Sequence, residues 1–176
     1  LPIDDQGGWL YPLISWHDPR TAPQHQWWQQ NIGVEKQFAI GGNPLWPINS
    51  ALRIRWVAEN EPAIYRRAYK WLLIEDFVNF MLCGRKVTDF SMASCTLLLD
   101  QRTRQWSEEL ISLSGIRREL LCEVLPSGSL IGEVNNKASE QTGLAEGTPV
   151  VLGGHDHLCG VIPVGAFQPG VALDVT

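Results

Sequence analysis

The stretch T-P-V-V-L-G-G-H-D-H-L-C-G, residues 148–160, decides the fold class. Its branched apolar run ends at two glycines, and Asp156 follows between His155 and His157. Because β-branched residues favour buried strands, the run predicts a strand. The residues after Asp156 predict an amphipathic helix, which Pro163 would bend or end early. A strand, a glycine turn and a helix in this order are typical of an α/β protein, whose ligands bind beyond the carboxyl ends of the strands.

The residues His155, Asp156 and His157 leave three interpretations open. An aspartate at a strand end can accept a proton from a hydroxyl nucleophile, which is the general-base role in phosphoryl transfer. It can also be only a helix cap. In the third interpretation, His155 and His157 point the same way on an extended chain and share a zinc ion. A zinc site needs a further ligand, and His17 and His25 lie far away in sequence without a supporting motif.

The composition indicates a globular chain. Of its 176 residues, 44% are hydrophobic and 19% are charged, which fits a chain that buries a core. The net charge of −5 gives no support to a nucleic-acid or membrane partner, and no apolar run reaches the length of a membrane span. The four cysteines form no C-x-x-C motif and suggest reduced thiols, so we expect a cytoplasmic protein. The chain begins with Leu1, so residues before it are expected to be missing.

Apolar periodicity and punctuating residues predict further elements on either side of this stretch. Residues 10–16 look like a strand, and residues 170–176 start another. Asn49 or Ser50 can cap a first helix, and Pro62 begins a second helix that runs to Gly84. The remaining expected elements are a helix from Ser107 to Gly115, a strand at residues 129–134, and a helical turn through Ala138 that Gly143 closes.

The segment W-H-D-P-R, residues 16–20, is a second group of functional candidates. Asp18 and Arg20 offer an acceptor and a donor fork to a polyhydroxylated ligand, and Trp16 can pack against its apolar face. The alternative is a surface ion pair in a loop. Neither G-x-x-x-x-G-K-[ST] nor G-x-G-x-x-G occurs, so the residues that grip the phosphates of any nucleotide are expected outside these 176 residues.

An ordered series of segments resembles the FGGY family of carbohydrate kinases, which phosphorylate glycerol, xylulose, gluconate and fuculose. The segments are P-L-I-S-W-H-D-P-R (12–20), N-S-A-L-R-I-R-W-V-A-E-N-E-P (49–62), Y-K-W-L-L-I-E-D-F-V-N-F-M-L-C-G (69–84), T-D-F-S-M-A-S (88–94), L-L-L-D-Q-R-T-R-Q-W-S-E-E-L (97–110), L-P-S-G-S-L-I-G-E-V (125–134) and T-G-L-A-E-G-T-P-V-V-L-G-G-H-D (142–156). Each piece is weakly specific alone, but the ordered series is strongly specific.

The resemblance implies an α/β fold of the ribonuclease H-like (actin-like ATPase) class. Family members have two such domains around a cleft, with the sugar bound mainly to the first and ATP with Mg²⁺ mainly to the second. The chain looks like an incomplete first domain, with a mostly helical insert at about residues 20–125 and a return to the core sheet at 126–176. The second domain is absent.

The resemblance also implies functional residues. Asp156 is the expected catalytic base, and the expected contacts to the sugar or polyol are His157, Asp18, Arg20, Trp16 and Asn49. The D-x-G-T motif of the family is absent, and its second G-T phosphate motif would follow Thr176, so we expect the chain alone to be inactive. The rival hypotheses are a non-catalytic kinase remnant or interaction module, and a zinc hydrolase that uses His155 and His157. A homodimer is left open.

Overall fold

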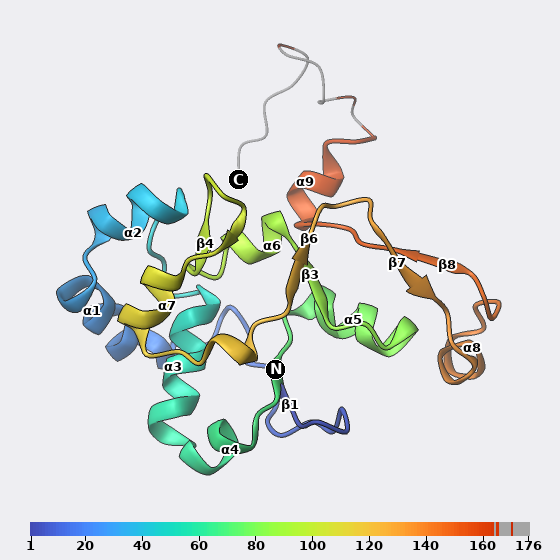
Figure 1. Ribbon diagram of the computed structural model, residues 1–176, viewed down its shortest axis with the longest axis horizontal. Coiled ribbons are helices and arrows are strands. Elements are labelled where there is room, and N and C mark those ends of the chain that lie inside the picture. Colours follow the sequence, from blue (N-terminus) through green and yellow to red (C-terminus); the bar gives the residue numbers. More distant parts are fainter. Residues whose placement is uncertain (164, 166–169, 171–176) are drawn as a thin grey trace.

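The computed structural model of the chain describes residues 1–163, 165 and 170. Helices gather on one side of a central pair of short parallel strands, and an arm made of strand, helix and strand extends on the other side (Figure 1). The last described helix lies above the carboxyl end of the central pair (Figure 1). The predicted strand at residues 170–176 falls almost wholly outside the described residues.

The helices are mostly short. They are α1 (Ala22–Asn31), α2 (Val34–Gly41), α3 (Ser50–Asn60), α4 (Pro62–Arg67), α5 (Ile74–Cys83), α6 (Phe90–Ser94), α7 (Glu108–Ser114), α8 (Asn136–Thr142) and α9 (Asp156–Gly160), with 3-10 turns η1 (Pro19–Thr21) and η2 (Arg118–Leu120). Within the part of the chain that the structure describes, no helix combines the length and apolar character needed to cross a membrane.

The strands pair in twos. They are β1 (Pro2–Ile3), β2 (Lys70–Trp71), β3 (Val87–Asp89), β4 (Leu99–Asp100), β5 (Gln105–Trp106), β6 (Glu123–Leu125), β7 (Leu130–Glu133) and β8 (Pro149–Val151). The pair β3–β6 is parallel and aligns Asp89 with Leu125, whereas β1–β2, β4–β5 and β7–β8 are antiparallel. The parallel pair therefore brings the ends of two distant strands to one edge. The division into a mostly helical insert at about residues 20–125 and a return to the core sheet at 126–176 stays a prediction.

Several predicted helix ends are confirmed. The Ser107 side chain accepts a hydrogen bond from the Leu110 N–H at the start of α7. Gly84, Gly115 and Gly143 follow α5, α7 and α8 in the left-handed conformation, which glycine adopts without a Cβ clash. The predicted strands at 129–134 and at the P-V-V run are also present, as β7 and β8.

The predicted strand at residues 10–16 is wrong. These residues form no strand; nearby, Ile3 and Trp9 form an isolated bridge, and the Leu10 N–H donates to the Pro2 carbonyl. Pro12 lacks the N–H that a ladder needs. The apolar side chains also do not form a buried face, because Leu13 is 45% exposed and Trp16 is 64% exposed.

The single helix predicted from Pro62 to Gly84 is also wrong. The helix is interrupted between α4 and α5, where β2 forms and pairs with β1 near the N-terminus. The Tyr69 N–H donates to the Ile3 carbonyl, and the Leu72 N–H donates to the Leu1 carbonyl. The aromatic periodicity that suggested one helix therefore covers two helices and a strand, because pairing between distant segments overrides local propensity.

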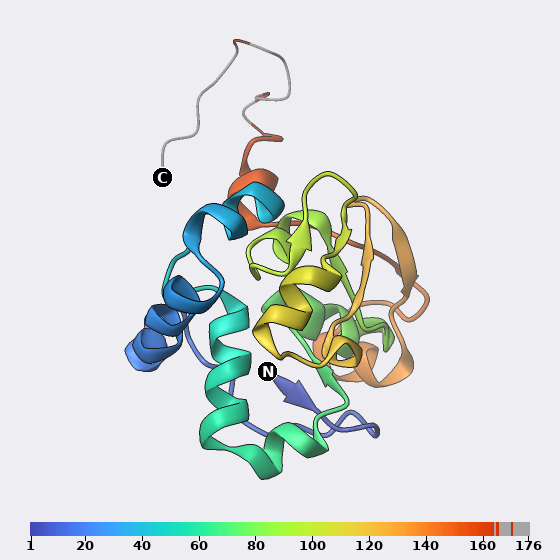
Figure 2. The ribbon, with the colours of Figure 1, turned by 60° about the vertical axis from the view of Figure 1, so that its left-hand side comes forward.

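The main apolar core surrounds α3. Leu52 and Val57 of α3 pack with Trp28 of α1, Leu98 and Leu110, all of which are fully buried. Figure 2 shows α1 beside α3, so the helices of this side form one packed body.

A second, smaller core lies under the arm. Val87 of β3 packs there with Ile131 of β7 and with Val150 and Leu152 around β8. Val151 points outward and is 53% exposed, so β8 is buried on one face only, not on both as the apolar run suggested. This core joins the arm to the central strand pair and thereby fixes where the chain leaves β8.

Candidate functional site

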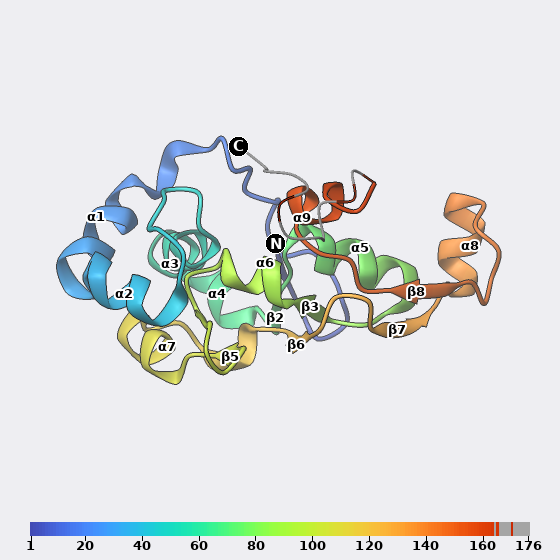
Figure 3. The same cartoon turned by 90° about the horizontal axis from the view of Figure 1, so that it is seen from above.

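Residues 153–157, here called the acid loop, connect β8 to α9. Asp156 is the first residue of α9, and the N-cap position falls on His155, whose side chain makes no capping bond. The structure therefore differs from the helix-cap interpretation by one residue. Figure 3, seen from above, places α9 near the middle of the molecule, with α8 at the far end of the arm.

The Asp156 carboxylate is open to solvent. Its side chain is 86% exposed, and its Oδ1 accepts a hydrogen bond of 2.9 Å from the His157 N–H. His155 Nδ1 lies 3.0 Å from the same oxygen, and the two histidine rings stack with centroids 5.3 Å apart. The carboxylate is thus flanked by two imidazoles and remains accessible to a ligand.

The two histidines were candidates for zinc binding. Among residues 1–163, 165 and 170, no three His, Cys, Asp or Glu side chains come together in a way that could hold a metal ion. His155 Nδ1 and His157 Nε2 lie 3.0 Å and 3.9 Å from the Asp156 Oδ1. The zinc hypothesis therefore finds no ligand set in the described part of the chain.

A buried polar group, here called the aspartate cluster, lies directly beneath the acid loop. It consists of Asp89 at the end of β3, Ser91 in α6 and Ser127 just after β6. Asp89 is fully buried, and its Oδ2 accepts from the Ser91 N–H (2.8 Å), the Ser91 hydroxyl (2.6 Å) and the Ser127 hydroxyl (2.8 Å). Its Oδ1 accepts from the Met92 N–H at 2.9 Å. A buried carboxylate needs such donors to offset the loss of water.

The aspartate cluster touches the acid loop through Ser91. The His155 N–H donates to the Ser91 Oγ at 2.8 Å, across 64 positions of sequence. A Cβ added at Gly154 would lie 3.1 Å from the Ser91 Oγ and 3.4 Å from the Asp89 Oδ2. Glycine at this position therefore allows the close approach on which the contact depends. Sequence reasoning used T-D-F-S only as part of the resemblance and did not identify these residues.

Glu75 on α5 is a second carboxylate near the acid loop. Its burial, followed by the charge of Asp89, raises the pKa of the Glu75 carboxyl above its ordinary value. A Cβ added at Gly153 would lie 3.2 Å from the Glu75 Oε1. Both glycines of the G-G-H-D-H stretch therefore pass close to acidic side chains.

Residues 16–20, here called the tryptophan loop, hold the second group of candidates. The Asp18 side chain caps η1 by accepting from the Arg20 N–H at 3.0 Å, and its Oδ2 lies 2.7 Å from the Arg20 Nη2. These hydrogen bonds from Arg20 lower the pKa of Asp18. Arg20 also donates to the Tyr11 hydroxyl and lies 4.5 Å from the Trp56 ring centroid. The Asp18 carboxylate and the Arg20 guanidinium therefore satisfy part of each other's hydrogen-bonding capacity.

Trp16 has a different setting from its neighbours in the tryptophan loop. Its side chain is 64% exposed, and its ring lies against that of His17, tilted by 30° with centroids 3.5 Å apart. An exposed indole of this kind is available to pack on the apolar face of a ligand.

Asn49 uses its side chain to hold the backbone in place. It is buried, its Oδ1 accepts from the Trp46 N–H at 2.6 Å, and its Nδ2 donates to the Cys95 carbonyl at 2.8 Å. Arg53 of α3 donates to the Ser15 carbonyl at 3.0 Å and to the Ile48 carbonyl. Through Arg53, the start of α3 contacts Ser15, directly before the tryptophan loop, and Ile48 in residues 46–49, here called the Asn49 turn.

Cys95 lies beside Asn49. Its carbonyl accepts from Asn49, and its thiol pKa is raised first by burial and then by the charges of Asp89 and Asp156.

Comparisons with known proteins agree with this architecture. Residues 1–163 match the model of the FGGY family of carbohydrate kinases, N-terminal domain. The L-fuculokinase of Escherichia coli K12 is 35% identical over 166 residues, which cover 94% of this chain and 35% of that protein. An autoinducer-2 kinase of Salmonella paratyphi B is 37% identical over 139 residues, which cover 79% of this chain and 26% of that protein.

Solved structures give the same result. The crystal structure of xylulose kinase from Rhodospirillum rubrum superposes with a TM-score of 0.90 at 26% identity, covering 96% of this chain and 35% of that one. The chain spans about a third of the length of the relatives that it matches. The expected fold class is confirmed: the chain is a partial N-terminal domain of the actin-like (ribonuclease H-like) ATPase fold. It belongs to the FGGY family of carbohydrate kinases.

Proposed function

We propose that the complete gene product containing this chain transfers the γ-phosphoryl group of ATP to a hydroxyl of a sugar or polyol. In this proposal the chain supplies the sugar-binding side and the proton acceptor. The observation that carries it is the exposed Asp156 carboxylate, which stands beyond the carboxyl ends of β3 and β6, where α/β sheets bind their ligands. The family and the names of the relatives support the same reaction class.

Asp156 acts as the general base. It accepts the proton of the sugar hydroxyl as that oxygen forms its bond to phosphorus, and ADP leaves with the electrons of the broken bond. ATP supplies the phosphoryl group and Mg²⁺ offsets its charge; no phosphate loop occurs in the 176 residues, so their binding residues are expected elsewhere in the gene product. The contribution of this chain is positioning and proton transfer.

The sugar contacts come from both groups of candidates. His157 lies beside the base and offers an imidazole to a neighbouring hydroxyl. The Trp16 indole packs on the apolar face of the sugar, and Asp18, Arg20 and Asn49 line the pocket from the tryptophan loop and the Asn49 turn. The Arg53 side chain, which donates to the Ser15 and Ile48 carbonyls, supports placing the tryptophan loop and the Asn49 turn on one side of that pocket.

A substrate panel tests the reaction. The complete gene product is incubated with ATP, Mg²⁺ and L-fuculose, xylulose, gluconate or glycerol, and ADP formation is measured. We expect turnover with at least one sugar or polyol well above the rate of ATP hydrolysis alone. If no compound of the panel is phosphorylated, the result favours the rival hypothesis of a kinase remnant or interaction module.

The base is tested by Asp156→Asn. General-base catalysis typically contributes about 10²- to 10⁴-fold, so we expect kcat to fall by about 10³-fold while sugar affinity measured by calorimetry changes less than about 3-fold. Asp5→Asn is the matched control, because Asp5 is an exposed aspartate in the turn between β1 and the tryptophan loop. Activity of Asp156→Asn near that of the control would rule out the base assignment.

A further inference from the structure

One hydroxyl connects the buried aspartate cluster to the backbone of the acid loop. The Ser91 hydroxyl donates its proton to the Asp89 Oδ2 at 2.6 Å, and its oxygen accepts the His155 N–H at 2.8 Å. Since a hydroxyl has one proton, the bond to Asp89 leaves the lone pairs of the Ser91 oxygen to face His155. Asp89 thereby sets the orientation in which Ser91 holds the loop.

The carboxylate that orients Ser91 is itself rigidly held. Asp89 is fully buried at the end of β3 and receives hydrogen bonds from backbone and side chains of two further segments. Ser127 contributes one of them from the residues just after β6, the parallel neighbour of β3. The fixed reference point beneath the acid loop is therefore the edge of the central strand pair.

The bond from Ser91 meets the chain one residue before Asp156. Gly154 allows the loop backbone to lie close to Ser91, because any larger residue would place a Cβ 3.1 Å from the Ser91 Oγ. The Asp156 side chain itself is 86% exposed, and its hydrogen bond to the His157 N–H is within the same short helix. The backbone contact at His155 is thus the link between the exposed carboxylate and the buried scaffold.

We propose that Ser91, oriented by Asp89, is a positioning residue that fixes the backbone at His155 and so holds the Asp156 carboxylate in reach of the sugar hydroxyl. This inference rests on the proposed function of Asp156. Proton transfer requires heavy atoms within hydrogen-bond distance, and a misplacement of about 1 Å can cost about 10²-fold in rate. Ser91 does not touch the substrate in this proposal.

Steady-state kinetics of Ser91→Ala in the complete gene product test the proposal. We expect kcat to fall by about 10- to 100-fold while the KM for the sugar changes less than about 3-fold. Ser94→Ala is the matched control, since Ser94 lies in the same helix and its hydroxyl donates to the Ser91 carbonyl at 2.7 Å. The control is expected to keep wild-type kcat. Equal loss in both variants, or kcat of Ser91→Ala within about 2-fold of wild type, overturns the proposal.

Hydrogen exchange gives a readout that does not depend on activity. Loss of the acceptor at Ser91 is expected to speed exchange of the His155 amide by about 10-fold or more, whereas Ser94→Ala leaves it unchanged. If Ser91→Ala does not fold, Gly154→Ala replaces it, because this variant keeps both serines and adds a Cβ 3.1 Å from the Ser91 Oγ, at the contact between the loop and the aspartate cluster. Wild-type kcat and wild-type His155 exchange in Gly154→Ala would also overturn the proposal.

The two proposals fail in different ways. If Asp156→Asn is inactive and Ser91→Ala is as active as Ser94→Ala, the base assignment stands and the positioning role of Ser91 is wrong. If Asp156→Asn retains activity, the base assignment is wrong. The positioning of Asp156 for catalysis then fails with it, even where the exchange measurement shows that Ser91 holds the loop.

Discussion

The chain contains two His-Asp dipeptides, and the structure treats them in opposite ways. At His17-Asp18 the carboxylate is 26% exposed and bonds to the backbone and guanidinium of Arg20. At His155-Asp156 the carboxylate is 86% exposed, while the backbone beside it is held from below by Ser91. In the tryptophan loop, the Asp18 carboxylate itself holds the loop conformation through its hydrogen bonds to Arg20. In the acid loop, Ser91 holds the backbone, and the Asp156 carboxylate stays exposed to a ligand.

This difference indicates which of the two aspartates can act as a catalytic base. A carboxylate that caps a turn and pairs with an arginine has little capacity to accept a further proton, because its partners stabilise the charged form. The pKa of Asp18 is lowered by Arg20 for this reason. A base needs a fixed backbone and an open side chain together, and Asp156 combines the two.

Replacing each aspartate by asparagine gives the largest expected contrast. We expect Asp156→Asn to lower kcat by about 10³-fold and Asp18→Asn by less than about 10-fold, because only the first removes a proton acceptor. Both variants are compared on the sugar that the substrate panel identifies. Losses of similar size would break the contrast between the two loops and would move Asp18 into the catalytic machinery.

Removing the carboxylate beneath the acid loop is expected to affect stability strongly. Asp89→Ala leaves several donors without their acceptor, each at a cost of about 1–3 kcal/mol, so we expect the melting temperature to fall by about 10 °C. Asp156→Ala, at an exposed position, should change it by about 1 °C or less. Thermal unfolding followed by calorimetry measures both. A small shift for Asp89→Ala would mean that the cluster does not anchor the loop.

A fourth aspartate, Asp76 on α5, is buried, and its ionisation makes stability depend on pH. Burial raises its pKa from 3.8 to about 7, while the Leu73 N–H donates to its Oδ2. The folded state then binds a proton at Asp76 that the unfolded state has lost, so the contribution of Asp76 to the free energy of unfolding falls as pH rises from 3.8 to about 7.

The corresponding experiment compares melting temperatures at pH 5 and pH 8. We expect the wild type to lose several degrees more than Asp76→Asn over this range, because the variant has no carboxyl to ionise. Asp5→Asn, at an exposed site, should retain the full wild-type loss. A wild-type slope in Asp76→Asn would show that another group controls this pH dependence.

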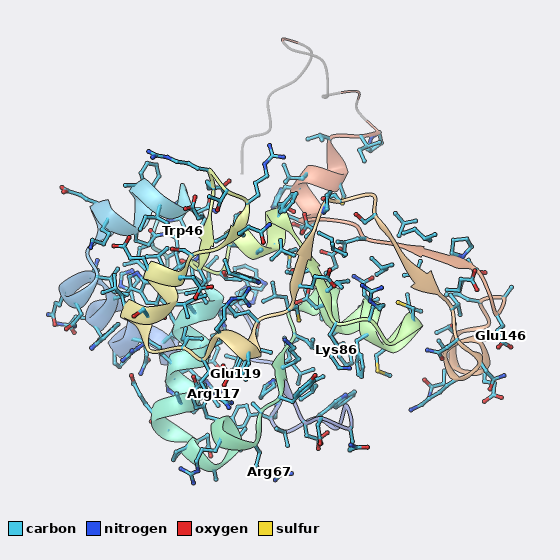
Figure 4. The ribbon with its side chains drawn as sticks, in the orientation of Figure 1. Trp46, Arg67, Lys86, Arg117, Glu119 and Glu146 are labelled. Atoms are coloured by element: carbon cyan, nitrogen blue, oxygen red, sulfur yellow. The ribbon has the colours of Figure 1, made fainter. Side chains whose placement is uncertain are left out.

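The smallest expected effect concerns the tryptophan loop. Arg20→Lys keeps the charge but loses the fork that reaches both Asp18 and Tyr11, and it loses the stacking over Trp56. We expect the melting temperature to fall by about 2 °C, since this ion pair is partly exposed. Arg67→Lys, at the exposed end of α4 (Figure 4), is the control and should show no change.

The sequence predicted those parts of the fold that depend on local chemistry. Gly84, Gly115 and Gly143 were identified as helix ends because a left-handed residue is a local requirement. β7 and β8 were predicted because their residue types favour strands. These signals lie within a few residues of the feature that they specify.

Pairing between distant segments was not predictable from periodicity. β2 forms because the Ile3 and Leu1 carbonyls accept hydrogen bonds from the Tyr69 and Leu72 N–H groups. The residues near position 70 carry no local signal that predicts this pairing. The three-residue strands β3 and β6 are too short to show a period of two. Local propensity therefore favoured one long helix where the fold has two helices and a strand.

In the candidate site, too, the residue with a local sequence signal was predicted and the residue that depends on a long-range contact was not. Asp156 was found because a strand, two glycines and an acid form a local pattern. Ser91 was missed because its contact with His155 spans 64 positions, and its local sequence reads as an ordinary capped turn after Asp89. The resemblance to a family supplied the order of the segments but assigned no role to this serine.

The arm formed by β7, α8 and β8 has a practical consequence for experiments on this protein. Residues 141–149 at its tip are all exposed, and Gly143 and Gly147 turn the chain there with positive φ. Glu146 marks this tip in Figure 4, at the opposite side of the molecule from the helices around α3. A fluorescent dye or an affinity handle attached at the tip would report on the protein without crowding the acid loop. The arm is therefore a natural position for labelling chemistry.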